Sequence, residues 1–344
     1  MKALLLSQYR HLELADIATP APQSGEILIR VAACGICGSD VHGYDGSSGR
    51  RIPPIVMGHE AAGAVAEVGE GVLGFNKGDR VTFDSTVYCG DCANCLRGDI
   101  NLCDRREVLG VSCGDYRRAG AFAEFVTVPA RIVYRLPDNL SFEQAALLEA
   151  VAVALHAVSL VPVAPGSTAL VVGAGMIGLL LQQALRVAGC SRIFVADIDS
   201  TRLAFSKQLG ATATLSERVP QQIAELTHGV GVDLAIEAVG KTEAVNTAID
   251  SVRKGGSVVL VGNISPQISL PLQKVVSRQL RLQGSCASAG EYPRAIELMS
   301  TGAIQVKPLI SAVAPLAEGP QWFERLYGRE PNLMKVVLTP DKLS

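Results

Sequence analysis

The stretch Thr168-Ala-Leu-Val-Val172, followed by Gly173-Ala-Gly175-Met-Ile-Gly178, decides the fold of the second half of the chain. A continuous apolar run is typical of a strand buried on both faces of a parallel sheet. In the glycine pattern that follows, the first glycine makes a tight turn, the second lets the backbone approach a pyrophosphate, and the third lets the next helix pack closely. We therefore expect a dinucleotide to be bound by Gly173, Gly175, Met176, Ile177 and Gly178, because a cofactor-free turn of the flavodoxin type fits this context less well.

A second strand over 192–196 ends at Asp197, which lies 19 residues after Gly178. An acid at about this spacing accepts hydrogen bonds from the adenine ribose, and its charge repels a 2′-phosphate. Arg202 points the other way, because an arginine near this position is able to accept that phosphate. We expect NAD as the cofactor, with Asp197 and Arg202 at its site and NADP as the less favoured alternative.

The chain on both sides of these elements divides into two patterns. Strands expected over 233–237 and 257–261 alternate with helices over 200–209 and 242–251, which indicates βαβ units and a parallel sheet. Residues 1–150 instead alternate short β-rich runs, such as EILIRVA at 26–32, with Gly, Pro and Asp. That pattern is typical of a mixed or barrel-like β domain.

Composition excludes several classes of protein. Of the 344 residues, 48% are hydrophobic, and 31 Lys plus Arg against 33 Asp plus Glu leave a net charge of −2, which argues against nucleic acid and anionic membranes as partners. The most apolar region, 145–181, is interrupted by charged residues, prolines and glycines, so it does not predict a membrane span. The short apolar run after Met1 does not predict a signal peptide. We expect a cytoplasmic protein, in which clustered cysteines are metal ligands more often than disulfides.

Four cysteines form a dense cluster, C-x2-C-x2-C-x7-C, at Cys89, Cys92, Cys95 and Cys103. Four thiolates at this spacing match a closed tetrahedral zinc site, which has no open position and is therefore structural. An iron–sulfur cluster is the chemical alternative, because C-x2-C-x2-C also occurs in ferredoxins. The fourth cysteine, seven residues further on and without a following proline, favours zinc.

A looser constellation lies nearer the N-terminus. Cys37 lies within G-I-C-G-S-D, and His59 and Glu60 follow Gly58 about 20 residues later. Sulfur, nitrogen and oxygen ligands suit zinc, and three protein ligands plus an open position are the arrangement of a catalytic zinc. Glu149, an acid inside an apolar segment, is either a further ligand or part of a structural ion pair.

These motifs together resemble the zinc-dependent medium-chain alcohol/polyol dehydrogenase family, close to its sorbitol, galactitol-phosphate and threonine dehydrogenase branches. G-A-F-A-E-F at 120–125 adds to the similarity, which extends over the whole chain. The resemblance implies an α/β protein with a GroES-like mixed β catalytic domain at 1–151, including a structural zinc lobe at 85–105. It implies a Rossmann domain with a doubly wound parallel sheet at 152–284, and a return to the catalytic domain at 285–344.

By position, the resemblance assigns roles to single residues. Cys37, His59 and Glu60 resemble the catalytic zinc ligands, and Glu149 resembles the acid that exchanges with or holds the zinc-bound water. Ser39 and His42 resemble the hydroxyl and imidazole of the proton relay. Asp40 resembles the carboxylate that orients the zinc-bound histidine. Two zinc ions per chain and one NAD are thus expected.

The implied reaction is oxidation of a secondary alcohol of a polyol, sugar alcohol or sugar-alcohol phosphate to a ketone, with hydride transfer to NAD. Ala150 stands where polyol dehydrogenases commonly have proline, and the tail lacks their Arg-Tyr pair, so sorbitol itself is not favoured. The alternatives are a threonine or simple diol dehydrogenase of the same family and, from another class, a non-catalytic NAD-binding structural protein. The partners expected are a small-molecule alcohol and further copies of the chain, as a homodimer or homotetramer.

Two groups of residues remain. The pairs Arg50-Arg51, Arg105-Arg106 and Arg117-Arg118 either form a solvated surface or offer a phosphate site to the substrate. Cys34, Cys190 and Cys286 are expected to be small buried apolar groups. Cys113 has no assigned role.

Overall fold

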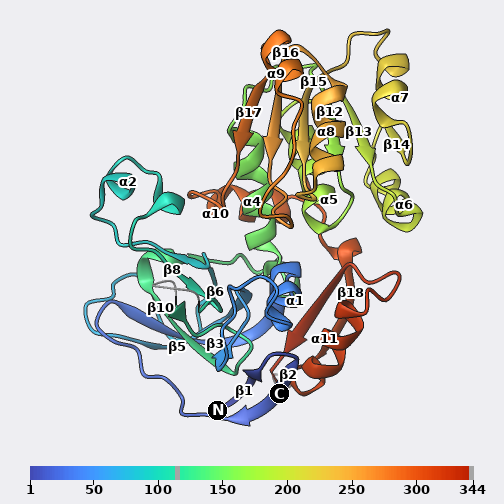
Figure 1. The fold of residues 1–344 in the computed structure, drawn as a ribbon. Coiled ribbons are helices and arrows are strands. Elements are labelled where there is room, and N and C mark those ends of the chain that lie inside the picture. The colour runs from blue at the N-terminus through green and yellow to red at the C-terminus, as the bar shows by residue number, and fades with distance from the viewer. Residues whose placement is uncertain (113–116, 341–344) are drawn as a thin grey trace. The chain divides into compact units, whose positions relative to one another are not determined.

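The computed structural model describes residues 1–112 and 117–340, and the chain divides into two compact units (Figure 1). Unit 1 comprises Met1–Glu149, Tyr292–Thr301 and Val306–Ser344, and unit 2 comprises Ala150–Glu291 and Gly302–Gln305. Cys113 lies outside the described residues.

Unit 1 is built mainly from antiparallel strands. Its strands are β1 (Lys2–Gln8), β2 (His11–Asp16), β3 (Glu26–Gly35), β4 (Ile55–Val56), β5 (Glu60–Val68), β6 (Arg80–Phe83), β7 (Thr86–Val87), β8 (Glu107–Leu109), β9 (Arg117–Arg118), β10 (Phe125–Pro129), β11 (Val133–Arg135), β18 (Ile310–Pro315) and β19 (Lys335–Thr339). Its α-helices are α1 (Gly38–Tyr44), α2 (Ala93–Leu96), α3 (Phe142–Ala145), α10 (Tyr292–Ser300) and α11 (Gly319–Tyr327), while α4 (Leu148–Ser159) begins in unit 1 and continues into unit 2.

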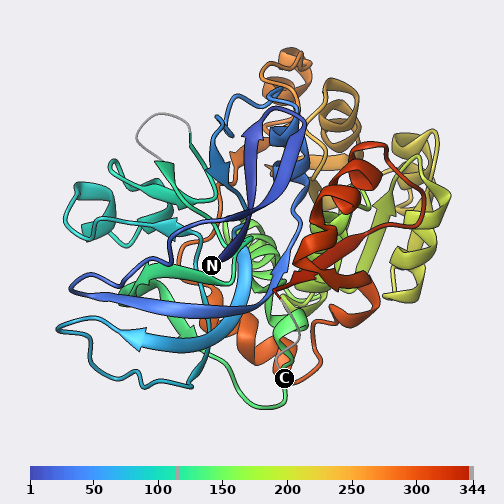
Figure 2. The same ribbon diagram turned by 90° about the horizontal axis from the view of Figure 1, so that it is seen from below.

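The central sheet of unit 1 has the order β11-β6-β5-β3-β19-β18 within the described residues, with β10 also paired to β3. Alternating aliphatic residues of β3 pack into a core with Phe83, Phe122 and Phe323, all of which are fully or almost fully buried. The strand β19 comes from the end of the chain and pairs antiparallel with β3, so the C-terminal segment lies beside N-terminal strands (Figure 2).

The register of this sheet brings distant residues together at one end of β3. Gly35, the last residue of β3, is paired with Glu60, the first residue of β5, and on its other side with Val337 of β19. The chain then continues from Gly35 into Cys37 and α1. Since antiparallel partners start where β3 ends, Cys37, Glu60 and the first residue of β19, Lys335, are delivered to one place.

Unit 2 is a parallel sheet in the order β14-β13-β12-β15-β16-β17. Its strands are β12 (Thr168–Val172), β13 (Arg192–Ala196), β14 (Ala213–Leu215), β15 (Val232–Glu237), β16 (Val252–Leu260) and β17 (Arg281–Gly284), and its further helices are α5 (Met176–Val187), α6 (Ser200–Gln208), α7 (Val219–Leu226), α8 (Thr242–Ser251) and α9 (Leu272–Ser277). The order runs outward from β12 in both directions, which is the doubly wound arrangement expected from the alternating strands and helices.

Glycine is required for a different steric reason at each of two positions in the first turn of unit 2. Gly173 has φ +102°, a left-handed conformation that favours glycine. A Cβ on Gly178 would lie 1.7 Å from the carbonyl oxygen of Gly173, so only glycine lets α5 approach β12 this closely. Nothing lies within 4 Å of a Cβ on Gly175, which leaves space over the start of α5.

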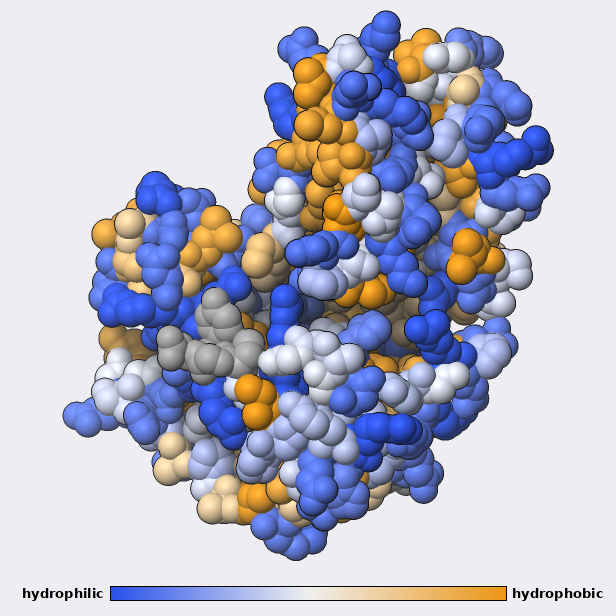
Figure 3. Space-filling model, in the orientation of Figure 1, coloured by the Kyte–Doolittle hydropathy of each residue, from blue (hydrophilic) through white to orange (hydrophobic). Residues whose placement is uncertain are grey.

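None of the helices among the described residues is both long and apolar enough to span a membrane. On the face drawn in Figure 3, hydrophilic residues are interspersed with separate apolar areas. Cys34 and Cys190 are buried, but the expectation that Cys286 is buried was wrong, since it is exposed. Cys286 lies just beyond β17, an edge strand whose own residues are exposed or only partly buried.

The carboxylate of Asp233 in β15 makes a testable link between strands. It accepts hydrogen bonds from the backbone N–H and hydroxyl of Thr168 at 2.8 and 3.0 Å and from Arg253 Nε at 2.8 Å. Burial alone would raise the pKa of Asp233, but the hydrogen bonds from Arg253 and Thr168 lower it below its usual value. A lowered folded-state pKa means that this stabilisation is present above the unfolded-state pKa, about 3.9, and is lost as the pH falls through the folded one.

We therefore predict that Asp233→Asn lowers the free energy of unfolding by about 1–2 kcal/mol at pH 7. The difference from the unsubstituted protein shrinks as the pH falls from about 4, the unfolded-state pKa, through the lower folded-state pKa of Asp233. Urea unfolding at both pH values measures it. Asp250→Asn, at an exposed ion pair with Lys274, is the control and should cost about 1 kcal/mol or less. A deficit that is the same at pH 7 and pH 3 would contradict this role for Asp233.

Candidate metal and cofactor sites

Cys37, His59 and Glu60 form one compact group in unit 1. One ligand atom from each lies within 4.8 Å of the ligand atoms of the other two. His59 and Glu60 are buried, and Cys37 is partly buried at the start of α1. A thiol, an imidazole and a carboxylate at this separation fit a single zinc ion, which binds such atoms at about 2.0–2.3 Å.

The ring of His59 is oriented by a buried carboxylate. Its Nδ1 lies 3.4 Å from Oδ1 of Asp40, while Oδ2 of Asp40 accepts the backbone N–H of Cys37 at 3.3 Å. With Nδ1 directed at Asp40, Nε2 of His59 is the nitrogen left for a metal. Burial alone would raise the pKa of Asp40, but the charges of His59 and Arg51 hold it below its usual range, so Asp40 is a carboxylate.

Glu60 is held by Lys335, the first residue of β19. Nζ of Lys335 donates to Oε2 of Glu60 at 2.5 Å and to the carbonyl oxygen of Ile36 at 3.1 Å. Both side chains are buried, with 3% and 1% exposed. A Cβ on Gly35 would lie 2.6 Å from the same Oε2, so glycine at this position makes room for the carboxylate.

The electrostatic field at the group favours a cation. Burial alone would lower the pKa of His59, yet the charges of Asp40 and Cys37 raise it well above its usual value. For Lys335 too, burial would lower the pKa, and Glu60 and Cys37 raise it. A site that favours a proton on a buried imidazole also favours a metal ion at the same nitrogen.

Glu149, in the first turn of α4, is not part of the group whose ligand atoms lie within 4.8 Å among the described residues. It is nevertheless in the same field, because burial raises its pKa to about 7, helped by Glu60 and Asp84 and opposed by His59 and Lys335. This arrangement does not place Glu149 as a direct ligand. It places an acid that changes protonation near neutral pH next to the ligands.

Ser39 and His42 lie on α1, immediately after Cys37. They are three residues apart, so they lie on one side of the helix, and both are exposed. Nη2 of Arg51 donates to the hydroxyl oxygen of Ser39 at 3.2 Å. The structure thus supplies a hydroxyl beside the ligand group and an imidazole one turn further towards water.

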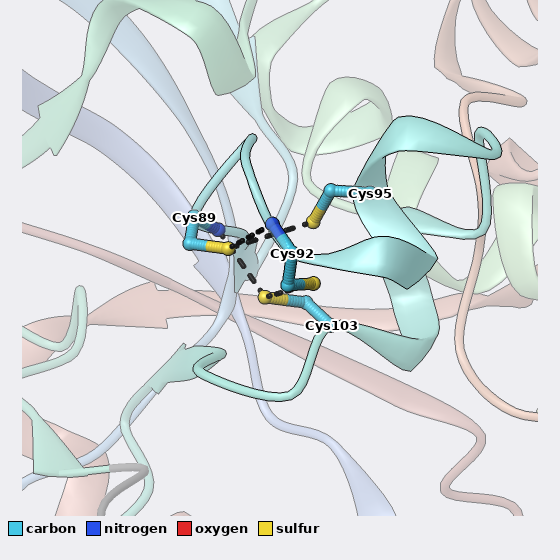
Figure 4. A group of neighbouring side chains, drawn as sticks. All are labelled: Cys89, Cys92, Cys95 and Cys103. Atoms are coloured by element: carbon cyan, nitrogen blue, oxygen red, sulfur yellow. Dashed lines mark hydrogen bonds between the residues drawn. The ribbon is translucent and has the colours of Figure 1, made fainter.

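The four cysteines predicted as the second zinc site also converge (Figure 4). The Sγ atoms of Cys89 and Cys95 are 3.8 Å apart, and those of Cys92 and Cys103 are 3.9 Å apart. A tetrahedral ion with zinc–sulfur bonds of about 2.3 Å separates its sulfur atoms by about 3.8 Å. The spacing therefore fits one shared ion better than an iron–sulfur cluster, in which the four thiolates are divided among two or four iron atoms.

Backbone N–H groups donate hydrogen bonds to two of these sulfur atoms. The N–H groups of Cys89 and Arg105 donate to Sγ of Cys103, and that of Cys92 donates to Sγ of Cys89, at 3.3–3.4 Å. Such hydrogen bonds favour the thiolate form that a metal needs.

In unit 2, the glycine turn is tied to Asp197. Oδ2 of Asp197 accepts the N–H of Ala174 at 2.6 Å, and Oδ1 accepts the N–H of Asp199 at 2.9 Å. Helix α5 begins after Gly175, which has no side chain to cap it, so the first N–H groups of α5 suit a phosphate. Met176 and Ile177 are partly exposed in this first turn.

Arg202, the possible ligand of a 2′-phosphate, is paired with a carboxylate. Its Nε lies 3.7 Å from Oδ2 of Asp199, and Asp199 also caps α6 by accepting the N–H groups of Thr201 and Arg202. Asp199 is therefore the carboxylate that pairs with Arg202.

Among the paired arginines, Arg50, Arg105 and Arg117 are exposed, as a solvated surface predicts, but Arg51 departs from both interpretations. Arg51 is 3% exposed and bonded to Asp40, so it belongs neither to a solvated surface nor to an open phosphate site. Arg118 is paired with Glu26 and Glu107, and Arg105 with Asp91. Adjacent arginines in a sequence say nothing about the acids that folding brings to them.

Arg51 and Lys335 are the residues that sequence reasoning missed. A signal existed for Lys335, which opens the otherwise apolar strand KVVL, because a charge in a buried strand needs a partner. Arg51 had no such signal, since the loop around it is polar.

Comparison with known proteins agrees with the fold. A family model described as the alcohol dehydrogenase GroES-like domain matches residues 23–138, and one described as zinc-binding dehydrogenase matches residues 177–301. The sorbitol dehydrogenase of Bacillus subtilis (strain 168) is 34% identical over 99% of this chain and 98% of its own length. The L-idonate 5-dehydrogenase of Vitis vinifera is 33% identical over 90% of this chain and 86% of its own.

Two solved structures carry nicotinamide cofactors. A protein from Sinorhizobium meliloti 1021 solved with NADP has a TM-score of 0.89 at 31% identity, covering 98% of this chain and 99% of its own. An alcohol dehydrogenase from Escherichia coli CFT073 solved with NADH has a TM-score of 0.91 at 29% identity, with the same coverages.

The fold and the two sites define an oxidoreductase that combines a GroES-like domain with a nicotinamide-binding Rossmann domain. The chain belongs to the zinc-dependent medium-chain alcohol/polyol dehydrogenase family.

The buried Lys335–Glu60 pair predicts a stability effect that depends on metal. Lys335→Met leaves a buried carboxylate without a partner, so the metal-free protein should lose about 3–5 kcal/mol of unfolding free energy. Zinc should reduce this loss, because a cation beside Glu60 replaces the missing charge. Denaturant unfolding of the metal-free and zinc-loaded variant measures both effects.

Lys274→Met, which breaks an exposed pair with Asp250, is the matched control and should cost about 1 kcal/mol or less with or without zinc. Equal stability of metal-free Lys335→Met and the unsubstituted protein would show that the pair does not hold Glu60.

Proposed function

We propose that the protein oxidises a secondary alcohol of a polyol or sugar alcohol to a ketone with NAD, or catalyses the reverse reaction, at a zinc ion held by Cys37, His59 and Glu60. The observation that carries the proposal is the compact group of these three side chains, two of them buried, with His59 facing the carboxylate of Asp40 and Glu60 paired with Lys335. We propose that the second zinc ion is structural and is held by Cys89, Cys92, Cys95 and Cys103, because four sulfur ligands leave no open position.

The residues around the first group have separable tasks. When bound, zinc supplies a Lewis acid for the alcohol oxygen, and the nicotinamide supplies a hydride acceptor. Ser39 accepts the hydroxyl proton of the alcohol, and His42 passes it to water. Asp40 keeps the ring of His59 in one orientation, and Lys335 restrains Glu60. Glu149, whose pKa is raised to about 7 by burial, takes up or releases a proton near the ligands around neutral pH.

An unphosphorylated polyol is the substrate class that we favour over a sugar-alcohol phosphate. The arginines that would bind a phosphate group include Arg51, Arg105 and Arg118, and each already bonds a carboxylate. We also propose that the protein assembles as a homodimer or homotetramer, which analytical ultracentrifugation tests.

Zinc content and turnover together test the proposed function. We predict about two zinc ions per chain, and NADH formation when a panel of polyols is screened by absorbance at pH values around neutrality. Cys37→Ala should lose one zinc and turnover, because it removes the only sulfur ligand of the proposed catalytic site. Cys103→Ser should lose the other zinc, because it opens the tetrahedral site.

Cys286→Ser, an exposed cysteine outside both groups, is the control and should keep both ions and full turnover. Protein prepared with zinc present that holds one ion or none, or that turns over normally without Cys37, would overturn the proposal.

Cofactor choice gives a second test. We predict tighter binding of NAD than of NADP, and a loss of about tenfold or more in this discrimination for Asp197→Asn, which removes the repulsive charge. Asp199→Asn keeps a good helix cap but frees Arg202, so NADP should bind more tightly while NAD binding stays nearly constant.

Titration of each variant with both cofactors, followed by intrinsic fluorescence, measures these constants. Arg202→Ala combined with Asp199→Asn should remove the gain for NADP. Preference for NADP in the unsubstituted protein would refute the role proposed for Asp197.

A further inference from the structure

Arg51 is a buried cation next to the proposed metal ligands, and the family resemblance assigns it no task. Its side chain is 3% exposed, and its Nη2 donates both to Oδ1 of Asp40 at 2.9 Å and to Oγ of Ser39 at 3.2 Å. The –NH2 end of a guanidinium carries two hydrogens in a fixed plane, so one nitrogen serves both acceptors at once. The Nε atom of Arg51 is buried without a hydrogen-bond partner.

The surrounding backbone is shaped for this side chain. A Cβ on Gly43 of α1 would lie 2.1 Å from Cγ and 2.9 Å from Cβ of Arg51, so glycine lets the arginine cross the helix. Ser39, Asp40 and Gly43 are therefore the face of α1 that receives Arg51. The loop that carries Arg51 is fixed from the other side, because Ser112 bonds the backbone of Arg50 and Ile52.

Asp40 connects this arginine to two proposed zinc ligands. Oδ1 of Asp40, the atom that accepts from Arg51, also lies 3.4 Å from Nδ1 of His59. Oδ2 accepts the backbone N–H of Cys37. Without Arg51, the buried carboxylate of Asp40 would lose its guanidinium partner and would keep only the ring of His59 and the N–H of Cys37 beside it.

Ser39 is restrained by the same nitrogen. A serine hydroxyl on an exposed helix surface samples several rotamers, whereas a donor on one lone pair of Oγ selects one of them. The O–H of Ser39 is then left with two staggered positions instead of three. A hydroxyl that accepts one proton and releases another works best when its orientation is restricted in this way.

We propose that Arg51 is a positioning residue that sets the Ser39 hydroxyl and the Asp40–His59 pair in one fixed geometry relative to the metal ligands. This proposal rests on the proposed function, which makes Ser39 a proton acceptor and His59 a zinc ligand. It adds Arg51 as a residue that positions both side chains. Arg51 touches neither substrate nor cofactor in this account. It acts only through Ser39 and Asp40.

The test compares Arg51→Met, Arg51→Lys and Gly43→Ala. Zinc affinity of the metal-free protein, measured by competition with a chromophoric chelator, should fall about 10- to 100-fold in Arg51→Met, the usual range for loss of a residue that orients a ligand. The visible absorption of the Co²⁺-substituted protein should shift as well, because the ring of His59 changes its angle. In turnover, kcat should fall by a similar factor with little change in KM.

Arg51→Lys keeps the charge but not the planar fork, so it should restore zinc affinity more than kcat, since one ammonium cannot serve both acceptors in the same geometry. Gly43→Ala should produce the same set of changes, although it removes no polar group. Arg80→Met is the matched control: its guanidinium bonds the carbonyl oxygens of Pro137 and Leu140. This variant should lower stability without altering zinc affinity or the cobalt spectrum.

The outcomes separate the two proposals. If the unsubstituted protein binds no zinc that depends on Cys37, the proposed function fails. If it does, but Arg51→Met keeps the same zinc affinity, cobalt spectrum and kcat, the proposal for Arg51 is overturned and the proposed function stands. Changes in Arg80→Met equal to those in Arg51→Met would also overturn it, because they would show a general loss of stability.

Discussion

Burial of charge is the constraint on which the site in unit 1 depends. A carboxylate inside a protein is expensive unless a cation or several donors lie beside it. Here Arg51 forms an ion pair with Asp40, and Lys335 forms one with Glu60. Both pairs are almost completely buried. The two cations come from segments that contribute no proposed ligand. They allow a thiol, an imidazole and a carboxylate to lie close together in a largely buried group.

The sheet explains why these groups meet. Residues of the N-terminal third and of the last strand converge because β5 and β19 both begin where β3 ends. Gly35 and Gly43 then leave the space that a carboxylate and an arginine stem occupy. Unit 2 also combines a glycine with a charged residue: Gly178 lets α5 approach β12, and Asp197 bonds the turn between them. In both units a small residue beside a charged one defines the site.

Much of the fold was predictable from local patterns. The apolar run at Thr168–Val172 and the glycines after it identify a parallel-sheet unit, and the cysteine spacing brings together four sulfur atoms that the structure also places together. Long-range pairing was not predictable from pattern alone, because nothing in KVVL says that Lys335 meets Glu60. Arg51 was misjudged for the same reason: its partner Asp40 is on another segment. Cys286 was misjudged because hydrophobicity predicts burial only where a second layer exists.

The central claim is that Cys37, His59 and Glu60 hold a zinc ion distinct from the four-cysteine ion. Anomalous diffraction from crystals, recorded on both sides of the zinc absorption edge, tests this most directly. The account predicts two zinc peaks per chain, one among Cys89, Cys92, Cys95 and Cys103 and one within bonding distance of Cys37 Sγ and His59 Nε2. A single peak at the four cysteines, with the Cys37 group empty in zinc-loaded crystals, would contradict it.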